Sequence, residues 1–217
     1  MSTFQRARQP AQKEQRRQAI LSAAAALFAE GGYDALSLTA IADRVGLAKS
    51  NLYRYFESRE EILLELLAGD LQRMTQEIEA ALAPLAGTGD RAAAARVLAR
   101  AWAVRPRSCQ LVSVLAAVLE RNVTEQRVAE FKLCVLALNR RIANALHAAL
   151  PGLSIEQCGW VVKAWGVLVA GLWPFSNPSP IVERVQQRPE LAETQYDFAA
   201  ELERSLDTLL AGLASDR

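Results

Sequence analysis

The chain has 217 residues, enough for one large or two small domains with a buried core. Half of the residues are hydrophobic, and Ala and Leu outnumber β-branched residues, so the composition excludes a disordered chain and predicts an all-α protein. The formal net charge is +1, but residues 1–17 alone carry +4 and residues 61–217 carry −2. Against the single Glu14, the N-terminal cations are Arg6, Arg8, Lys13, Arg16 and Arg17. Only the N-terminal end should therefore attract a polyanion.

Residues that support metal binding or catalysis are scarce. Cys109, Cys134 and Cys158 form no CxxC pair, and His147 is the single histidine, so we expect no metal and no cofactor. That histidine has no matched Ser or Asp for a triad, and there is no Gly-rich phosphate loop. The sequence therefore predicts no catalytic residue and a protein that is not an enzyme. Widely spaced thiols with apolar neighbours are typical of inert cysteines rather than redox sensors.

The first residues, 1–12, lack hydrophobic periodicity and contain Pro10, so they are predicted to form a flexible basic arm. A helix is predicted from Lys13 to the Gly31–Gly32 stop. The odd cysteine count, the absence of a secretory leader and the absence of an apolar run of 18 residues predict a cytoplasmic protein with no membrane partner.

Two short helices follow the first one. Ser37 is a good N-cap for a helix that ends at Gly46, and the next helix spans Lys49 to Tyr55. The capping box Ser58–Glu61 then begins a long helix that ends before Pro84. Further helices are expected near residues 90–104, 107–121, 125–149, 154–173 and 194–212, with an ordered loop or surface linker at 174–180.

The two short helices have the spacing of a helix-turn-helix over residues 37–56. Such helices cross steeply, so the residue at their closest approach must be small and the turn must tolerate an unusual backbone angle. Ala42 and Gly46 meet these demands, and Leu52 follows six residues later. We therefore predict a three-helix DNA-binding domain over residues 13–60.

The second short helix has a polar and cationic face that suits a major groove. Lys49 and Arg54 can pair with phosphates or guanine edges, and Asn51 can hydrogen-bond a base. The Tyr53 hydroxyl can reach a phosphate. The bases that these side chains read are not determined by the sequence.

The residues from Ile41 to Ile62 closely resemble the DNA-binding core of the tetracycline-repressor-like (TetR/AcrR) family, as does the preceding stretch Ala26–Tyr33. The run Leu-Tyr-Arg-Tyr-Phe over residues 52–56 is the most diagnostic part. The resemblance implies a homodimer whose two recognition helices enter successive major grooves of a palindromic operator in double-stranded DNA. It also implies a transcriptional repressor that a small-molecule ligand releases from this operator.

The resemblance also assigns roles to residues. It implies phosphate contacts from Ser37 and Thr39, and support or a phosphate contact from Tyr55. The implied recognition surface comprises Lys49, Ser50, Asn51, Tyr53 and Arg54. The chain departs from the family pattern at Ala48, where a capping Ser is common, and at Arg59, where Lys is common and the positive charge stays available to a phosphate.

Residues 61–217 are predicted to form a helical effector-binding and dimerisation domain. The segment 159–173 is apolar nearly all round, and the last helix has an apolar stripe. By resemblance these two long helices pair with their symmetry mates, although both could instead close the core of the monomer. A small, largely apolar effector is expected between the middle helices, in contact with Trp102, Leu111, Leu115, Phe131, Cys134 and Trp165. Aromatic or Cys residues at helical spacing are more often ordinary core than ligand contacts.

Several alternatives stay open. The basic arm is either a solvated tail or a segment that lies along DNA. A helical enzyme and a helical interaction protein without DNA specificity are the other classes, and each lacks positive support. The sequence leaves open repressor or activator, the operator, the effector and whether the ligand releases DNA.

Overall fold

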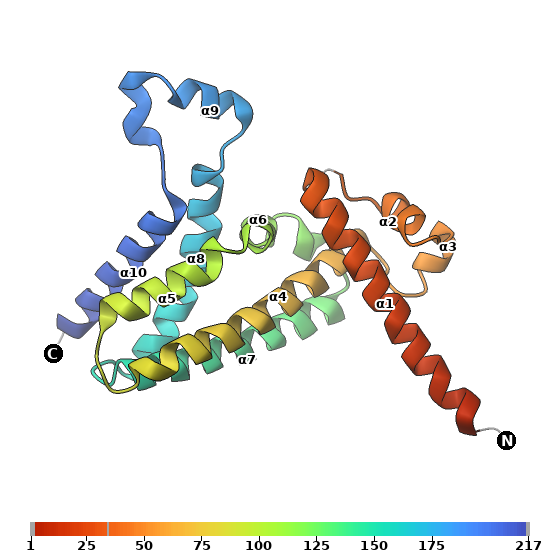
Figure 1. The fold of residues 1–217 in the computed structure, drawn as a ribbon, viewed down its shortest axis with the longest axis horizontal. Coiled ribbons are helices and arrows are strands. Elements are labelled where there is room, and N and C mark those ends of the chain that lie inside the picture. The colour runs from red at the N-terminus through yellow and green to blue at the C-terminus, as the bar shows by residue number, and fades with distance from the viewer. Residues whose placement is uncertain (1–2, 34, 216–217) are drawn as a thin grey trace. The chain divides into compact units, whose positions relative to one another are not determined.

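The computed structural model describes residues 3–33 and 35–215, with side chains from residue 11 onward. Every secondary-structure element in these residues is a helix (Figure 1), as the composition predicted. The α-helices are α1 (Thr3–Gly31), α2 (Leu38–Arg44), α3 (Lys49–Leu52), α4 (Arg59–Leu82), α5 (Arg91–Ala103), α6 (Pro106–Val114), α7 (Glu125–Ala149), α8 (Ile155–Ser176), α9 (Pro180–Gln186) and α10 (Phe198–Ser215). The short 3-10 helices are η1 (Ala83–Leu85), η2 (Leu119–Arg121) and η3 (Pro189–Thr194).

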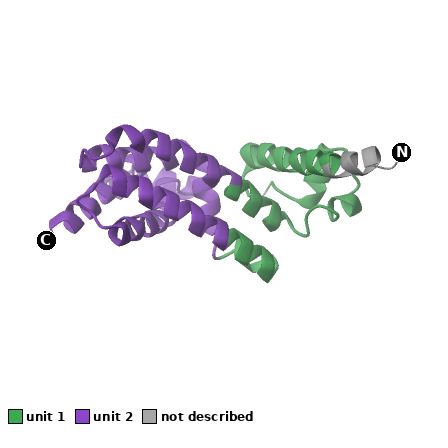
Figure 2. Cartoon of the chain, turned by 90° about the horizontal axis from the view of Figure 1, so that it is seen from below, with its two compact units in different colours: residues 1–68, 117–131 green, residues 69–116, 132–217 purple. Residues whose placement is uncertain are grey.

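The chain forms two compact units (Figure 2). Residues 1–68 and 117–131 make unit 1, and residues 69–116 and 132–217 make unit 2. Helices α4 and α7 each give residues to both units, because one helix can bury its first turns in one core and its later turns in another. The domain boundary expected after residue 60 thus falls within the part of α4 that belongs to unit 1. Residues 117–131, which were expected in the effector domain, also belong to unit 1.

Unit 1 has a small apolar core to which α1, α2 and α3 contribute. Ile20, Ala24 and Phe28 of α1 are buried, as are Ile41 of α2 and Leu52 of α3. Capping holds these elements in place: the Ser37 side chain accepts a hydrogen bond from the Ala40 amide at 3.1 Å, which confirms the predicted N-cap.

Helix α1 begins ten residues earlier than Lys13. Residues 3–12, expected as a flexible arm, form its first turns, whereas Met1 and Ser2 lie outside the described residues. The surrounding Gln, Arg, Ala, Lys and Glu residues are strong helix formers, and their summed propensity outweighs the backbone donor that Pro10 removes.

Unit 2 has the larger core, formed by α5, α6, α8 and α10 with the later turns of α4 and α7. Leu98 and Trp102 of α5 pack here with Val161 and Trp165 of α8. Most of the apolar stripe of α10 packs into this core, whereas Leu209 is only half-buried. The four buried residues of α10, which face α5 and α8, are Phe198, Leu202, Leu206 and Leu210.

Three boundaries in unit 2 differ from the sequence expectations. Helix α6 ends at Val114 and is followed by η2, so no helix runs continuously over 107–121. Helix α8 continues through Pro174 to Ser176, and α9 replaces most of the expected loop because Ser179 caps it and Pro180 fits its first turn. The last helix begins at Phe198 rather than near 194, because the Asp197 side chain accepts a hydrogen bond from the Ala200 amide at 2.9 Å.

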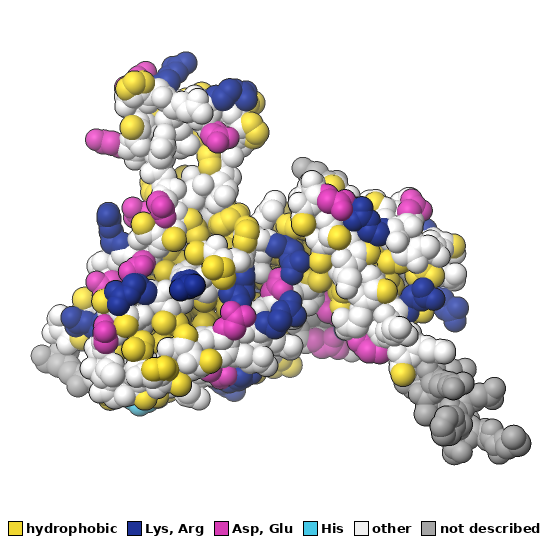
Figure 3. Space-filling model, in the orientation of Figure 1, with side chains coloured by type: hydrophobic (Ala, Val, Ile, Leu, Met, Phe, Trp, Pro, Cys, Tyr) yellow, Lys and Arg dark blue, Asp and Glu magenta, His cyan; other side chains and the backbone are white. Residues whose placement is uncertain are grey.

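Apolar side chains remain exposed along α8 and the α9 segment. Helix α8 is long and apolar enough to cross a membrane by length and composition, and only 28 % of its apolar stretch is buried within the fold. The α9–η3 segment projects beyond the ends of α8 and α10 (Figure 1) and carries apolar side chains on its surface (Figure 3), among them Ile181 at 67 % exposure. These surfaces need a partner, as large exposed apolar patches generally do.

Candidate nucleic-acid interface and effector core

The helix-turn-helix of unit 1 is set by its buried small and apolar residues. Ala42 and Leu52 are fully buried, and Gly46 has φ +65° in the turn between α2 and α3. Helix α3 ends at Leu52 instead of Tyr55. Beyond it the Arg54 amide bonds to the Asn51 carbonyl and the Tyr55 amide to the Leu52 carbonyl, so residues 53–55 form tight turns rather than an α-helix. Ala48 offers no side-chain cap, as the sequence indicated.

The polar residues expected at the recognition surface lie together and face solvent. Lys49, Ser50 and Asn51 of α3 are exposed, as is Arg54, and the Tyr53 side chain is 50 % exposed. Within the described structure, Lys49, Asn51 and Arg54 make no side-chain hydrogen bond or ion pair with the protein, so their donors are available to a ligand. Ser37 and Thr39 are exposed at the start of α2, and Tyr55 is half-buried.

Arg59 differs from the other expected DNA contacts because the protein itself occupies its guanidinium. It donates to the Leu36 carbonyl at 3.0 Å, to the Tyr33 hydroxyl at 2.9 Å and to Glu60 at 2.9 Å. The guanidinium also lies 4.3 Å from the centroid of the Tyr33 ring. Burial, together with the hydrogen bond donated to Glu60, raises the pKa of Tyr33. Arg59 thus ties the start of α4 to the end of α1 and the residues before α2.

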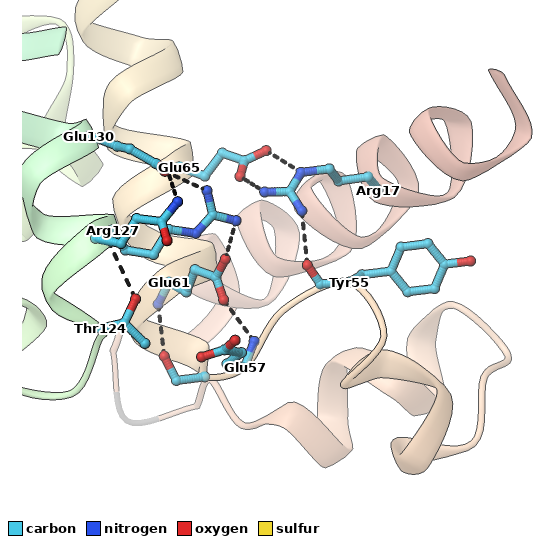
Figure 4. Close-up of polar contacts among 10 residues, drawn as sticks. Arg17, Tyr55, Glu57, Glu61, Glu65, Thr124, Arg127 and Glu130 are labelled. Carbon is cyan, nitrogen blue, oxygen red and sulfur yellow. Dashed lines mark hydrogen bonds and ion pairs between the residues drawn. The ribbon is translucent and has the colours of Figure 1, made fainter. Parts of the chain in front are cut away.

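A second arginine fixes the chain just after the recognition helix (Figure 4). Arg17 of α1 donates to the Tyr55 carbonyl at 2.8 Å and forms a two-pronged ion pair with Glu65 of α4, with Nε–Oε1 at 2.8 Å. Its guanidinium also lies 4.2 Å from the centroid of the buried Phe56 ring. Bidentate pairs of this kind add geometric specificity. Arg17 therefore holds the position of the recognition turn relative to α1 and α4.

Residues far apart in sequence meet on the other side of the same turn (Figure 4). Arg127 of α7 pairs with Glu61 of α4 at 2.5 Å, and Glu61 accepts the Glu57 backbone N–H at 2.7 Å. Ser58 accepts the Glu61 amide at 3.1 Å, which is half of the predicted capping box. Sequence reasoning missed the roles of Arg17, Glu65 and Arg127. The capping motif flagged Glu61, but no local signal indicates a partner 66 positions away.

In unit 2 the expected effector residues are mostly core. Trp102 and Trp165 are 3 % and 2 % exposed and pack edge to face, with ring centroids 5.7 Å apart and planes at 69°. Within the described structure, neither indole N–H has a hydrogen-bond partner. An unsatisfied buried donor costs roughly 1–3 kcal/mol, so two of them side by side are an unusual feature of an apolar core.

The other four expected effector residues do not form one group with the tryptophans. Leu111 is fully buried in α6, and Leu115 and Cys134 are half-buried in unit 2. Phe131 is buried in unit 1, so it is not brought to the same core. A cavity of about 490 Å³ in unit 2 has none of the six in its lining. It is lined by Gly89, Asp90, Arg91, Ala92, Leu150, Gly152, Leu153, Asp207 and Ala214.

The three cysteines are free thiols. Burial raises the pKa of Cys109 to about 12 and that of Cys158 to about 11, so both stay protonated and unreactive near neutral pH. Cys109 also donates to the Trp102 carbonyl at 3.4 Å. Among the described residues, no three His, Cys, Asp or Glu side chains cluster as metal ligands.

Comparison with known proteins assigns both parts of the chain to one family. Residues 20–66 match bacterial regulatory proteins of the tetR family, and residues 68–217 match the tetracyclin repressor-like C-terminal domain. The HTH-type transcriptional repressor KstR of Rhodococcus jostii is 45 % identical over 64 residues, which cover 30 % of each chain. The HTH-type transcriptional activator FasR of Mycolicibacterium smegmatis is 34 % identical over 70 residues, or 32 % of each chain. The aligned part thus spans about a third of these curated relatives.

Solved structures extend the likeness over nearly the whole chain, at the level of the fold. FadR of Thermus thermophilus, a TetR-family transcriptional repressor solved in complex with lauroyl-CoA, has a TM-score of 0.58 at 20 % identity and covers 91 % of this chain and 94 % of its own. The two family matches together cover residues 20–66 and 68–217, which include α2, α3 and the whole of unit 2. The chain therefore belongs to the tetR family of bacterial regulatory proteins.

Proposed function

We propose that this chain is a homodimeric repressor that binds a palindromic operator through α2 and α3 of each subunit and leaves it when a small, largely apolar molecule binds unit 2. The carrying observation is the group of exposed polar and cationic side chains on and just after α3, which have no partner among the described residues and lie within the part of the chain that matches the tetR family. We further propose a cytoplasmic location, with residues 13–60 as the DNA-binding domain and 61–217 as the effector-binding and dimerisation domain.

Base reading is assigned to three side chains in this proposal. Lys49 and Arg54 contact guanine edges or phosphates, and Asn51 contacts a base. Ser50, Tyr53 and the α2 residues Ser37 and Thr39 contact the backbone. Tyr55 supports this surface through its carbonyl, which Arg17 holds. Arg59 is assigned a positioning role, because three of its five N–H donors already serve Tyr33, Leu36 and Glu60.

The proposed dimer interface lies on the last two long helices, with α8 as its main apolar surface. On one exposed face of α8, residues spaced by three or four are Trp160, Lys163, Val167, Gly171 and Pro174. Four of these five are uncharged, and Val167 is 73 % exposed. The stripe of α10 closes the core of its own unit, so α10 would contribute polar and small residues at the edge. A two-fold axis lets one such face serve both subunits.

An exposed-valine pair tests this interface. We expect Val167→Asp to convert the dimer to a monomer, because the aspartate would be desolvated between two copies of α8. Val104→Asp makes the same change at a valine that is 60 % exposed at the C-cap of α5 and should leave the dimer intact. Light scattering measures the particle mass of both full-length variants. A Val167→Asp protein that still has twice the chain mass would rule out α8 as the interface.

For the effector, the two unpartnered indoles support a molecule that is mostly apolar but carries a hydrogen-bond acceptor. The chain has four tryptophans, so Trp160→Phe with Trp173→Phe leaves Trp102 and Trp165 as the sole tryptophans, whose emission can be excited selectively over that of the tyrosines. Compounds that release DNA should then shift or quench this emission, and Trp102→Phe or Trp165→Phe should weaken their binding. Compounds that release DNA without changing the emission would place the effector elsewhere in the protein.

The regulator itself is tested by selection. The purified full-length protein is incubated with randomised duplex DNA at near-physiological salt, and the bound fraction is sequenced. Enrichment of a palindrome by a particle of twice the chain mass supports the proposal. A promoter reporter then separates repression from activation, since the relative FasR is a transcriptional activator. If a folded dimer enriches no sequence, with or without the effector candidates, the DNA-binding proposal fails and an interaction protein becomes the better reading.

A further inference from the structure

Unit 1 contains a cleft between α1 and the turn that follows the recognition helix. Its volume is about 780 Å³. The α1 wall consists of Gln12, Lys13, Gln15, Arg16 and Ala19, and the opposite wall consists of Arg54 and Tyr55. The cleft therefore borders the residues already assigned to DNA, but most of its lining comes from a helix without such a role.

The α1 wall belongs to a part of the helix that the core of unit 1 does not need. The first buried residue of α1 among the described side chains is Ile20, and residues 11–19 are exposed except for the half-buried Arg17. Gln12, Arg16 and Ala19 recur at spacings of four and three, which places them on one side of the helix. This extension thus presents a polar and cationic face to the cleft without contributing apolar packing.

The basic side chains in this region line the cleft, whereas the acidic side chain lies outside it. Lys13, Arg16 and Arg54 line the cleft, and none of the described lining residues carries a carboxylate. The single acid in this stretch, Glu14, is absent from the lining and accepts a hydrogen bond from Gln18 at 2.7 Å. Within the described structure, Lys13 and Arg16 have no hydrogen-bond or ion-pair partner. Three unpaired cations around one cleft create a local positive field that suits a polyanion.

The two walls are also held at a fixed separation. Arg17, on the same turn of α1 as Lys13 and Arg16, donates to the Tyr55 carbonyl and pairs with Glu65. The buried Phe56 ring lies beneath its guanidinium. Because Tyr55 forms part of the opposite wall, this contact presets the cleft before any ligand binds, which lowers the ordering cost of binding.

We propose that this cleft receives the sugar-phosphate backbone of operator DNA beside the base pairs that α3 reads, with Lys13 and Arg16 pairing with phosphates and Gln12 and Gln15 donating to their oxygens. The inference rests on the proposed function and deepens it. Charge complementarity and the continuity of the cleft with Arg54 and Tyr55 of the reading surface identify the occupant. Phosphate contacts fix register and carry no sequence information. The α1 extension thus raises affinity for all duplexes about equally.

The test is the salt dependence of DNA binding by full-length Lys13→Ala/Arg16→Ala. Fluorescence anisotropy measures Kd for the operator selected by the wild type, and for a scrambled duplex, between about 50 and 200 mM salt. Each lost phosphate contact lowers the slope of log K against log[salt] by about 0.9, so a dimer that loses four contacts should show a slope smaller by about 3.6. The ratio of operator to scrambled affinity should not change.

Arg96→Ala/Arg140→Ala is the matched control, because it removes the same charge from two exposed arginines of unit 2. It should keep the wild-type slope. If the Lys13/Arg16 variant keeps the wild-type salt slope, the inference is overturned while DNA binding itself stands. The inference is also overturned if the control variant shows an equally reduced salt slope. If the wild type itself binds no duplex, the proposed function fails first.

Discussion

Units 1 and 2 place their functional candidates in opposite environments. In unit 1 the residues assigned to DNA lie on the surface of α2 and α3, above the fully buried residues Ile41, Ala42 and Leu52. In unit 2, Trp102 and Trp165 are both effector candidates and members of the core. Recognition and stability are therefore separable in unit 1 and shared by the same side chains in unit 2.

This contrast has a physical origin. DNA is a large, charged surface that a protein meets from outside, so its contacts must project from a rigid support. A small apolar effector must be enclosed, so the residues that contact it must be drawn from the interior. Substitutions at the proposed binding residues should therefore change binding without changing stability in unit 1, whereas in unit 2 they should change both.

The largest effect is expected in the core of unit 2. Leu111→Ala deletes a fully buried side chain and should lower the free energy of unfolding by about 2–5 kcal/mol. Leu133→Ala removes the same atoms from a side chain that is 66 % exposed and should change it by no more than about 0.5 kcal/mol. Urea titrations measure both. Equal losses would show that burial in this unit does not determine stability.

In unit 1, Lys49→Ala and Tyr53→Ala should cut operator affinity without a matching loss of stability. Each removes an exposed side chain from the recognition surface. Lys49→Ala removes a proposed contact to a guanine edge or a phosphate, and a good base contact is worth about 1–3 kcal/mol of discrimination. Tyr53→Ala removes a proposed contact to the DNA backbone, which positions the protein without reading sequence. Anisotropy with operator DNA and a urea titration of each variant give the two quantities. Unchanged affinity in both variants would remove this face from the interface.

The ion pair between α7 and α4 should have an intermediate effect. Arg127→Met leaves the buried Glu61 carboxylate without its cationic partner, while Glu61 keeps the Glu57 amide. Since the Arg127 side chain is 38 % exposed, we expect a loss of only about 1–2 kcal/mol, in stability and in operator affinity together. Arg140→Met on the same helix is the control. A wild-type operator affinity in Arg127→Met would show that this pair does not position the recognition turn.

Arg59 provides a finer comparison within unit 1. If it positions the α1 and α4 ends through Tyr33 and Leu36, Arg59→Ala should lower stability by about 1 kcal/mol and keep the salt slope of DNA binding. If it instead contacts phosphate, the slope falls by about 0.9 per contact, or about 1.8 per dimer. The slope measured with operator DNA separates the two roles.

The smallest effect concerns the thiols of unit 2. The pKa of Cys109 is raised from an ordinary 9.0 to about 12, so its folded form binds a proton more tightly than its unfolded form. Stability from this group is complete below pH 9 and falls as the pH rises through 9 toward 12, because only the unfolded thiol ionises there. At pH 8 a thiol reagent should therefore label the half-buried Cys134 first. Faster labelling of Cys109 would show that its site opens readily.

Helices α8 and α10 show where sequence reasoning stops. Both have the apolar character that resembles a dimer interface, yet the stripe of α10 is buried against α5 and α8, whereas α8 keeps Trp160 and Val167 exposed. An amphipathic pattern predicts that one face of a helix is buried, but it does not identify the surface that buries this face. The same ambiguity affected Phe131, whose apolar character was right and whose unit was not the expected one.

The sequence by itself determined what depends on neighbouring residues: the all-helical class, the Ser37 cap, the turn at Gly46, and the polar face of α3, which matches the tetR family. These follow from backbone geometry and short-range hydrogen bonds. Only the tertiary structure decided which charges are free and which are paired. Arg17, Arg59 and Arg127 are engaged by partners up to 66 positions away, whereas Lys13, Arg16 and Arg54 are left unpaired in the described structure. Pairing depends on distance in space, and no local pattern encodes it.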